Sequence, residues 1–198
     1  GTITATQNCG NTSLTYSAPS ASLYWQTSAT GTSTANATTA PYTVSSNGTY
    51  YVRAFDGTCW STGTVSQAVT VVNPIAISSQ PTSQSVTTGN TATFSVTASN
   101  AAGYQWQVNT GSGWANIGGA TSASYTTPAA TLAMNGYQYQ VIVTGNTPCG
   151  NVTSASAILS VTTGPCFTED FASIGAGNST STAGSSTAWT GNANFPTV

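Results

Sequence analysis

Residues 103–108 read Gly103-Tyr-Gln-Trp106-Gln-Val108, and the fold can be argued outward from this stretch. Its polar and apolar positions alternate, as they do in a strand with one buried face. Phe94 lies twelve residues before Trp106, inside the alternating run 91–96, and a third alternating run follows at 137–143. Each of the three runs carries a large ring at its centre. The pattern predicts three half-buried strands that share one core.

A buried tryptophan on the third strand, facing core residues of the second and sixth strands, is typical of an immunoglobulin-like sandwich. Trp106, Phe94 and Tyr139 occupy those core positions. Tyr137 stands two residues before Tyr139, where such sandwiches have a tyrosine corner. Phe94 and Tyr139 also take the two places that often hold a cystine. We therefore expect an all-β fold made of antiparallel sheets.

The same plan occurs earlier in the chain, which indicates an internal repeat. Trp25 corresponds to Trp106 as a core residue, and Tyr50 takes the tyrosine-corner position. A turn signal at 47–48, Asn-Gly, corresponds to one at 135–136. We expect two tandem Ig-like β-sandwiches followed by a C-terminal β segment. The predicted divisions are 1–73 for the first domain, 74–163 for the second, and 164–198 for the start of a further β module or an assembly segment.

Strand G of the second repeat is expected at 153–161, with one buried face. The residues expected on that face are Ala155, Ala157, Leu159 and Val161.

Composition excludes several classes of protein. Apolar residues make up 38% of the 198, which supports a folded core and argues against disorder. The net charge is −2 with one basic residue, so a nucleic-acid partner is not expected. No apolar run approaches the roughly 20 residues of a membrane span. Gly1 leads directly into an expected strand, so we expect a mature or excised polypeptide.

Only 2% of the residues are charged, and folded surfaces usually carry far more. Sheet edges are commonly guarded by Lys or Pro, which prevents pairing with other chains. Two interpretations follow. Either this is an extracellular protein kept soluble by hydroxyl groups and glycans, or its edges are covered by another copy.

Four cysteines allow three pairings. Cys9 ends the first edge strand, and Cys59 follows strand F of the same repeat, which is expected at 49–54. We therefore expect a Cys9–Cys59 disulfide worth roughly 3–4 kcal/mol. Thr88 stands where the second repeat would need the partner of Cys149. Cys166 lies beyond strand G, too distant for a favoured bond with Cys149. We expect Cys149 and Cys166 to be unpaired or intermolecular, in an oxidising extracellular or cell-surface setting.

Catalytic and metal chemistry find no support. Glu169 and Asp170 are adjacent and would point to opposite faces of a strand, and Asp56 belongs to an Asp-Gly turn. With no histidine, a Ser-His-Asp or Cys-His site cannot form, and carboxylates are too few for a strong calcium site. We expect no enzyme, cofactor or metal. Arg53 is expected to pair with Asp56 or to stand exposed.

Trp60 and Trp114 are the remaining candidates for binding. Both could stack on sugar rings, and surface polysaccharide is the ligand class this chemistry suits. The simpler interpretation is that both tryptophans cap the ends of the sandwiches.

Several motifs resemble the Ig-like repeats of secreted and cell-surface proteins of the Bacteroidetes. The run from Tyr50 to Trp60 (YYVRAFDGTCW) resembles one repeat type. The motifs at 80–86 (QPTSQSV), 104–107 (YQWQ), 117–122 (IGGATS) and 134–139 (MNGYQY) resemble a second. Phe167 to Phe171 resembles the opening of a further β module. The resemblance covers about 1–163.

The resemblance implies a non-catalytic module of a multidomain adhesin, gliding or surface-layer protein, or extracellular hydrolase, often exported by type IX secretion. Members often have a cysteine near Thr88 that pairs with the position of Cys149, and this chain departs from them there. The expected role is a rigid spacer or display repeat. Its partners would be neighbouring modules or other copies of the chain.

Three alternatives remain open at this point. The chain could be an extracellular filament subunit that assembles by strand addition through 164–198 or 1–8. It could be a spacer of a hydrolase whose catalytic domain lies elsewhere. It could also be a carbohydrate-binding module.

Overall fold

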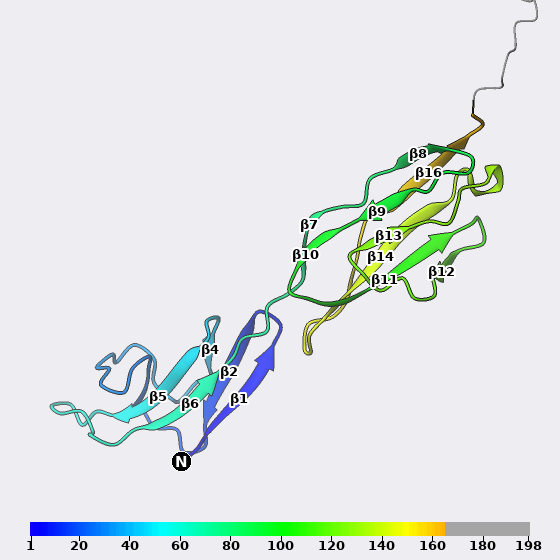
Figure 1. Ribbon diagram of the computed structural model, residues 1–198. Helices are drawn as coiled ribbons and strands as arrows, with labels where there is room; N and C mark the ends of the chain where they lie inside the picture. Colours follow the sequence, from blue (N-terminus) through cyan, green and yellow to red (C-terminus); the bar gives the residue numbers. More distant parts are fainter. Residues whose placement is uncertain (165–198) are drawn as a thin grey trace, which may run out of the picture. The chain divides into compact units, whose positions relative to one another are not determined.

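The alternating stretches form strands throughout residues 1–164, the part of the chain that the computed structural model describes (Figure 1). The strands build two tandem β-sandwiches, as the sequence predicts. The expected further module at 164–198, including Cys166, Glu169, Asp170 and the 167–171 motif, lies outside the described residues apart from Gly164.

The first sandwich consists of two antiparallel three-stranded sheets. One sheet has the order β1-β2-β4 and the other the order β3-β5-β6. Their bounds are β1 (Ile3–Asn8), β2 (Asn11–Tyr16), β3 (Leu23–Gln26), β4 (Tyr42–Val44), β5 (Gly48–Ala54) and β6 (Val65–Val69).

The core of the first sandwich lies between these sheets. Leu14 from β2 is fully buried and Trp25 from β3 is 1% exposed. Tyr42 stacks on Trp25 with ring centroids 5.9 Å apart, and Val52 from β5 closes the cluster. The expected tryptophan of strand C therefore sits where one face of each sheet excludes water.

The second sandwich is built on a larger sheet with the order β12-β11-β14-β16-β8, to which β15 adds by pairing with β14. Two short pairs, β9–β13 and β7–β10, face it. The bounds are β7 (Ala76–Ser79), β8 (Gln84–Thr87), β9 (Thr93–Ser95), β10 (Thr97–Ser99), β11 (Ala101–Asn109), β12 (Trp114–Asn116), β13 (Ser124–Thr126), β14 (Gln138–Gly145), β15 (Val152–Thr153) and β16 (Ala157–Thr162), with a short 3₁₀ helix η1 (Leu132–Met134) before β14.

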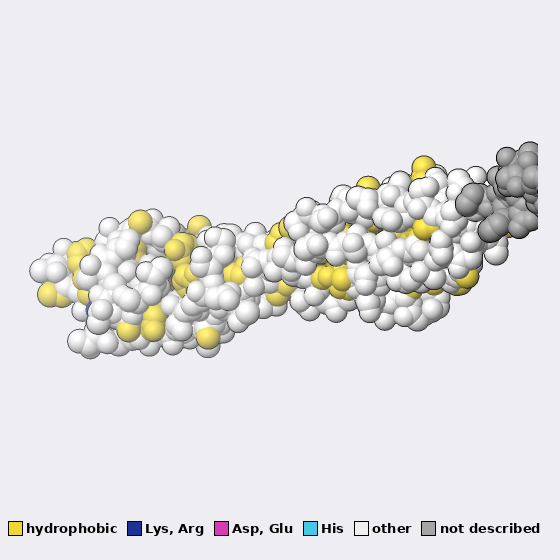
Figure 2. Space-filling model, turned by 45° about the horizontal axis from the view of Figure 1, so that its top comes forward, with side chains coloured by type: hydrophobic (Ala, Val, Ile, Leu, Met, Phe, Trp, Pro, Cys, Tyr) yellow, Lys and Arg dark blue, Asp and Glu magenta, His cyan; other side chains and the backbone are white. Residues whose placement is uncertain are grey.

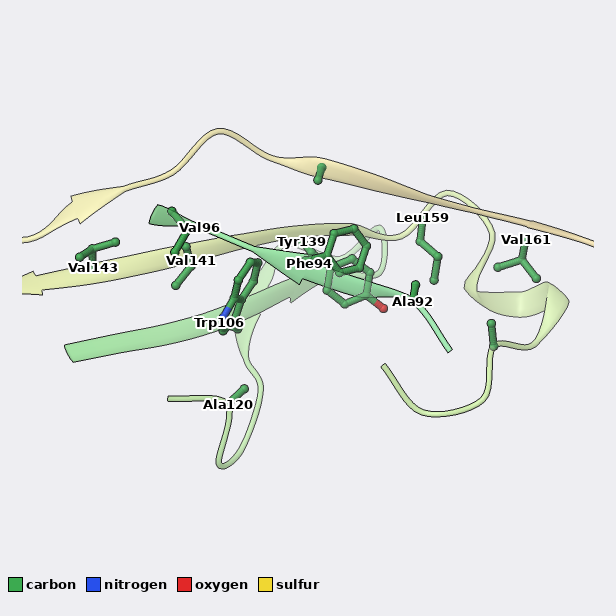
Figure 3. Close-up of a cluster of buried hydrophobic side chains, with 12 residues drawn as sticks. Ala92, Phe94, Val96, Trp106, Ala120, Tyr139, Val141, Val143, Leu159 and Val161 are labelled. Atoms are coloured by element: carbon green, nitrogen blue, oxygen red, sulfur yellow. The ribbon is translucent and has the colours of Figure 1, made fainter. Parts of the chain in front are cut away.

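Aromatic rings take the place of a cystine in this second core (Figure 3). Phe94 and Tyr139 stack with centroids 4.5 Å apart, and both are buried. Trp106 lies beside them, 6.4 Å from Phe94, and is 0% exposed. Its indole Nε1 donates to the main-chain oxygen of Ser122 at 2.9 Å. The cluster therefore joins the facing sheets without a covalent bond.

The first strand of the second sandwich changes sheets at Pro81. Before Pro81, β7 pairs antiparallel with β10, and after it β8 pairs parallel with β16. Proline has no N–H to give to a ladder and so breaks a strand. The break lets one stretch of chain close both sheets along the same side.

Strand G departs from the predicted pattern at Ser154. The sequence predicted Ala155 on the buried face, but Ala155 is exposed and Ser154 is buried instead. The Ser154 hydroxyl accepts a hydrogen bond from Val141 N at 3.0 Å, and the main-chain N–H of Ala155 donates to Gln80 Oε1. These side-chain bonds interrupt the ladder between β15 and β16, so the alternation shifts by one residue.

The corner before strand F, which is β5 in the first sandwich and β14 in the second, is held by an asparagine in both. Asn47 Oδ1 accepts from Val71 N at 2.7 Å, and Asn135 Oδ1 accepts from Val161 N at 2.9 Å. Each bond fastens the corner to the chain segment of strand G. The turn signals noted in the sequence are thus also cross-links between strands.

The tyrosine corners differ between the repeats. Tyr50 donates its hydroxyl to Ser46 O at 2.9 Å, the bond expected of a tyrosine corner. Tyr137 is half-buried, and none of the hydrogen bonds within residues 1–164 involves its hydroxyl. One residue fewer separates Asn135 from Tyr137 than separates Asn47 from Tyr50, so the two rings enter their corners differently.

Burial raises the pKa of Tyr139 to about 12, and nearby Tyr125 and Tyr137 add to the shift. A raised tyrosine pKa means that the native state disfavours the phenolate. Stability should therefore be complete below about pH 10, the ordinary tyrosine pKa, and fall as pH rises toward 12. Urea midpoints followed across this range should show the loss. Tyr139→Phe should keep the neutral-pH midpoint and lose less at high pH; an identical alkaline loss in this variant would contradict the assignment.

Candidate functional site

The feature with clearest consequences is a disulfide between the two sandwiches. Cys9 follows β1 in the first sandwich, and Cys149 lies in the loop after β14 in the second. Their sulfurs are bonded, the Cα atoms are 4.8 Å apart, and 140 positions separate them in sequence. The chain segment around Val72–Pro74 is the peptide connection between the same two sandwiches. They are therefore joined covalently twice.

Cys9 is brought to the end of its sandwich by main-chain pairing. It forms a parallel bridge with Val72, and Gly10 N donates to Val72 O at 2.8 Å. Gly10 has φ +83°, a conformation that glycine adopts at no steric cost. Cys149 Sγ lies 3.5 Å from the same Val72 oxygen. Both sulfurs thus sit directly beside the segment that leads into the second sandwich.

The predicted Cys9–Cys59 disulfide is wrong. Cys59 is a free, exposed thiol. Strand β5 begins opposite Val69, close to Val72, and ends opposite Leu23, so the loop that holds Cys59 lies at the other end of the sandwich from Cys9. The prediction that Cys149 lacks a partner within the chain is corrected by the same bond.

Cys59 and Cys149 nevertheless occupy corresponding places, each in the loop after strand F. In the second sandwich that loop lies next to the connection between the sandwiches, because Gly145 pairs with Ala101 and Asn100 donates to Pro74 O at 2.8 Å. A cysteine after strand F therefore meets the preceding sandwich and not the first strand of its own.

Arg53 is the one basic residue of the chain, and it is buried, with 9% exposed. Its guanidinium donates to Gly31 O at 2.6 Å and twice to Ser61 O. It also lies over the ring of Trp60, 5.5 Å from the centroid. The prediction that Arg53 pairs with Asp56 or stands exposed is wrong, because main-chain oxygens and an aromatic ring satisfy the cation.

Asp56 holds its own turn. Its Oδ1 accepts hydrogen bonds from Cys59 N at 2.7 Å and Thr58 N at 2.8 Å. These bonds, with Cys59 the larger contributor, lower the pKa of the Asp56 carboxyl. Arg53 is thus buried, whereas Asp56 is exposed and holds its own turn, and the face shown in Figure 2 is almost entirely uncharged.

The two candidate sugar-binding tryptophans differ in environment. The Trp60 ring stacks on Phe55 with centroids 4.8 Å apart, meets Tyr24 edge-on at 5.8 Å, and carries the Arg53 guanidinium. These neighbours already occupy much of its surface, as the capping interpretation requires. Trp114 is 38% exposed on the edge strand β12. No contact brings the two tryptophans into one binding surface.

Two pockets within the described residues are small and are lined mainly by small and polar side chains. One of about 200 Å³ is lined by residues 118–122 and 124–126, and one of about 220 Å³ by Trp25, residues 35–37 and residues 39–42. Tyrosine is the only titratable side chain lining either. No group of three His, Cys, Asp or Glu side chains suited to a metal ion occurs in residues 1–164. Nor does that part of the chain contain a helix long and apolar enough to cross a membrane.

Solved structures that match this chain include tandem Ig-domain proteins. The first eight Ig domains of Down Syndrome Cell Adhesion Molecule match 81% of this chain and 24% of their own, with 10% identity and a TM-score of 0.54. Three titin Ig domains match 81% of this chain and 60% of theirs, at 12% identity and a TM-score of 0.46. Drosophila OTK extracellular domains 3–5 match 82% of this chain and 57% of theirs, at 13% identity and a TM-score of 0.45.

The first of these likenesses shows the fold, and the chain spans about a quarter of that molecule. No protein-family model matches the sequence, and no curated protein matches it.

Arg53→Lys should destabilise the first sandwich by about 1–3 kcal/mol, because one ammonium cannot satisfy both carbonyl groups and keep its place over Trp60. Chemical denaturation measures the loss. Asp56→Asn is the matched control. The Asn side-chain oxygen can still accept both hydrogen bonds of the turn, and Asp56 makes no ion pair with Arg53 in the native protein. A loss as large in Asp56→Asn as in Arg53→Lys would show that charge pairing matters after all.

Peptide mapping without reductant should recover Cys9 and Cys149 in one linked pair, with Cys59 open to alkylation in the folded protein. Cys59→Ser should leave both the linkage and the thermal midpoint unchanged. Cys149→Ser should lower the thermal midpoint. A cross-link over so long a loop lowers the conformational entropy of the unfolded chain and so stabilises the native state by several kcal/mol. A Cys9–Cys59 peptide would overturn the pairing.

Proposed function

We propose that the chain is a non-catalytic structural or adhesive module of a secreted bacterial surface protein, and that it acts as a rigid spacer or display unit. The observation that carries this proposal is the second covalent connection between the sandwiches, at Cys9 and Cys149. Two modules joined only by a short peptide retain hinge freedom by default. A disulfide beside the peptide removes most of that freedom.

The chemistry of the described residues supports the same role. The one carboxylate, Asp56, accepts hydrogen bonds within its own turn, and the one guanidinium is buried on main-chain oxygens. The guanidinium is therefore buried, and the carboxylate serves its own turn with no second charged side chain beside it. A disulfide also suits an oxidising, extracytoplasmic setting. The bacterial and type IX contexts rest on the motif resemblance at 50–60 and 104–107. We keep the domain division at 73–74 as part of this proposal.

Stiffness at rest tests the spacer role. Spectroscopic labels are placed through non-natural amino acids at exposed Ser66 on β6 and exposed Ser160 on β16, which leaves the cysteines native. The oxidised protein should give one narrow distribution of label-to-label distances. Cys149→Ser should broaden it, and Cys59→Ser should not. A distribution equally broad in the oxidised wild type and in Cys149→Ser would refute a rigid spacer.

The second candidate is a filament subunit that assembles by strand addition, and strand β1 favours it. β1 pairs with β2 along six regular positions, and its residues from Thr4 to Asn8 are exposed and uncharged. Such an edge lacks the charges that usually prevent pairing with other chains. Sedimentation of the full chain and of a chain lacking 164–198 separates the readings, because filaments that persist after the deletion cannot depend on that segment.

A further inference from the structure

We propose that the Cys9–Cys149 disulfide makes this a load-bearing module, in which tension applied to the chain ends bypasses residues 10–148 and with them most of both hydrophobic cores. The inference rests on the proposed spacer role, because a spacer at a surface is pulled through its two ends. It concerns what happens under force, which stiffness at rest does not determine.

The covalent path decides where tension runs. A pull on the two ends enters at Gly1, reaches Cys9, crosses the disulfide to Cys149 and leaves through the rest of the chain. The Cα atoms of Cys9 and Cys149 are held 4.8 Å apart, so residues 10–148 between them cannot be stretched. That protected loop contains the whole linker and almost all of both cores.

The cores excluded from the path are the ones that hold the sheets together. In the first sandwich they include Trp25 and Val52, and in the second Phe94, Trp106 and Tyr139. Without the disulfide, the same pull would pass through the linker near Pro74 and load the two sandwiches in series. Each core would then be exposed to unfolding by force.

The strands that do carry tension can release little length. β1 runs toward Cys9, and in the second sandwich β16 leads away from the end that holds Cys149 to the end of the described chain (Figure 1). A strand already rises about 3.2–3.4 Å per residue, whereas a fully extended chain reaches only about 3.3–3.6 Å. Pulling along β1 and β16 therefore gains little extension before covalent bonds bear the load.

Both strands are also anchored along their length. β1 pairs with β2 from Ile3 to Asn8, and β16 pairs with β8 from Leu159 to Thr162 and with β14 at Ala157 and Ile158. Ala157, Leu159 and Val161 are buried in the second core. The strands in the path are thus held laterally by strands of the protected segment, whose own ends the disulfide keeps from being pulled apart.

Reduction should switch the module to a different mechanical state. Two thiols replace the bridge, with the reductant supplying two electrons and two protons and being oxidised itself. The separation of 140 positions then becomes available as contour length, at about 3.3–3.6 Å each, or roughly 460–500 Å. The chain would change from nearly inextensible to one that extends by stepwise unfolding.

Single-molecule force spectroscopy on the full chain, with handles at both ends, tests this directly. The oxidised protein should release no more than about 200 Å in total, the contour length of residues 1–9 and 149–198. Added reductant should raise the release by roughly 460–500 Å. Cys59→Ser should behave as the wild type in both states, which excludes exchange with the exposed thiol.

Cys9→Ser and Cys149→Ser should extend fully without reductant. If either variant folds poorly, the wild type compared before and after reduction still decides the question. An oxidised wild type that releases much more than 200 Å, or a release unaffected by reductant, overturns the bypass. A narrow distribution of label distances together with a long release of the oxidised protein would refute the load bypass and leave the spacer role standing. A broad distribution together with a short release would refute the rigid spacer and leave the load bypass standing.

Discussion

The contact of a strand-C tryptophan with the facing sheet is the interaction on which each sandwich depends. Trp106 packs beside the Phe94–Tyr139 stack, and Trp25 packs against Leu14 and Tyr42. Ig-like sandwiches often reinforce this contact with a cystine between strands B and F. Here rings and aliphatic chains fill both places. As a result, the cysteines are not needed inside either core, and one pair joins the two sandwiches to each other.

The two cores differ in how completely their buried polar atoms are hydrogen-bonded. Trp106 donates its indole N–H to Ser122 O, whereas Trp25 Nε1 and Thr12 Oγ1 are buried without a hydrogen-bond partner. An unsatisfied buried polar group costs about 1–3 kcal/mol. The first core is also the smaller cluster. The first core therefore gains less from burial than the second core.

The alternation of polar and apolar residues was enough to find the strands, because in a half-buried strand every second side chain faces the core. For that reason it predicted that Trp25, Trp106, Phe94 and Tyr139 are buried. It failed at Ser154, where a side chain replaces a ladder hydrogen bond and shifts the register, a choice that composition does not encode. It failed most at the cysteines. Pairing Cys9 with Cys59 assumed that both lie at one end of a sandwich, but strand direction places them at opposite ends.

The direction of strand F explains both the failure and the actual bond. β14 ends next to the connection from the first sandwich, so a cysteine after it faces the preceding sandwich, while the turn after β1 lies where the first sandwich ends. Tandem order alone then brings Cys9 and Cys149 together. Arg53 and Asp56, the two charged side chains within residues 1–164, both belong to the first sandwich, so no pair of charged side chains joins the two sandwiches there. The junction is specified by backbone pairing at Val72 and closed by a covalent bond, so it does not depend on charge attraction between the two sandwiches.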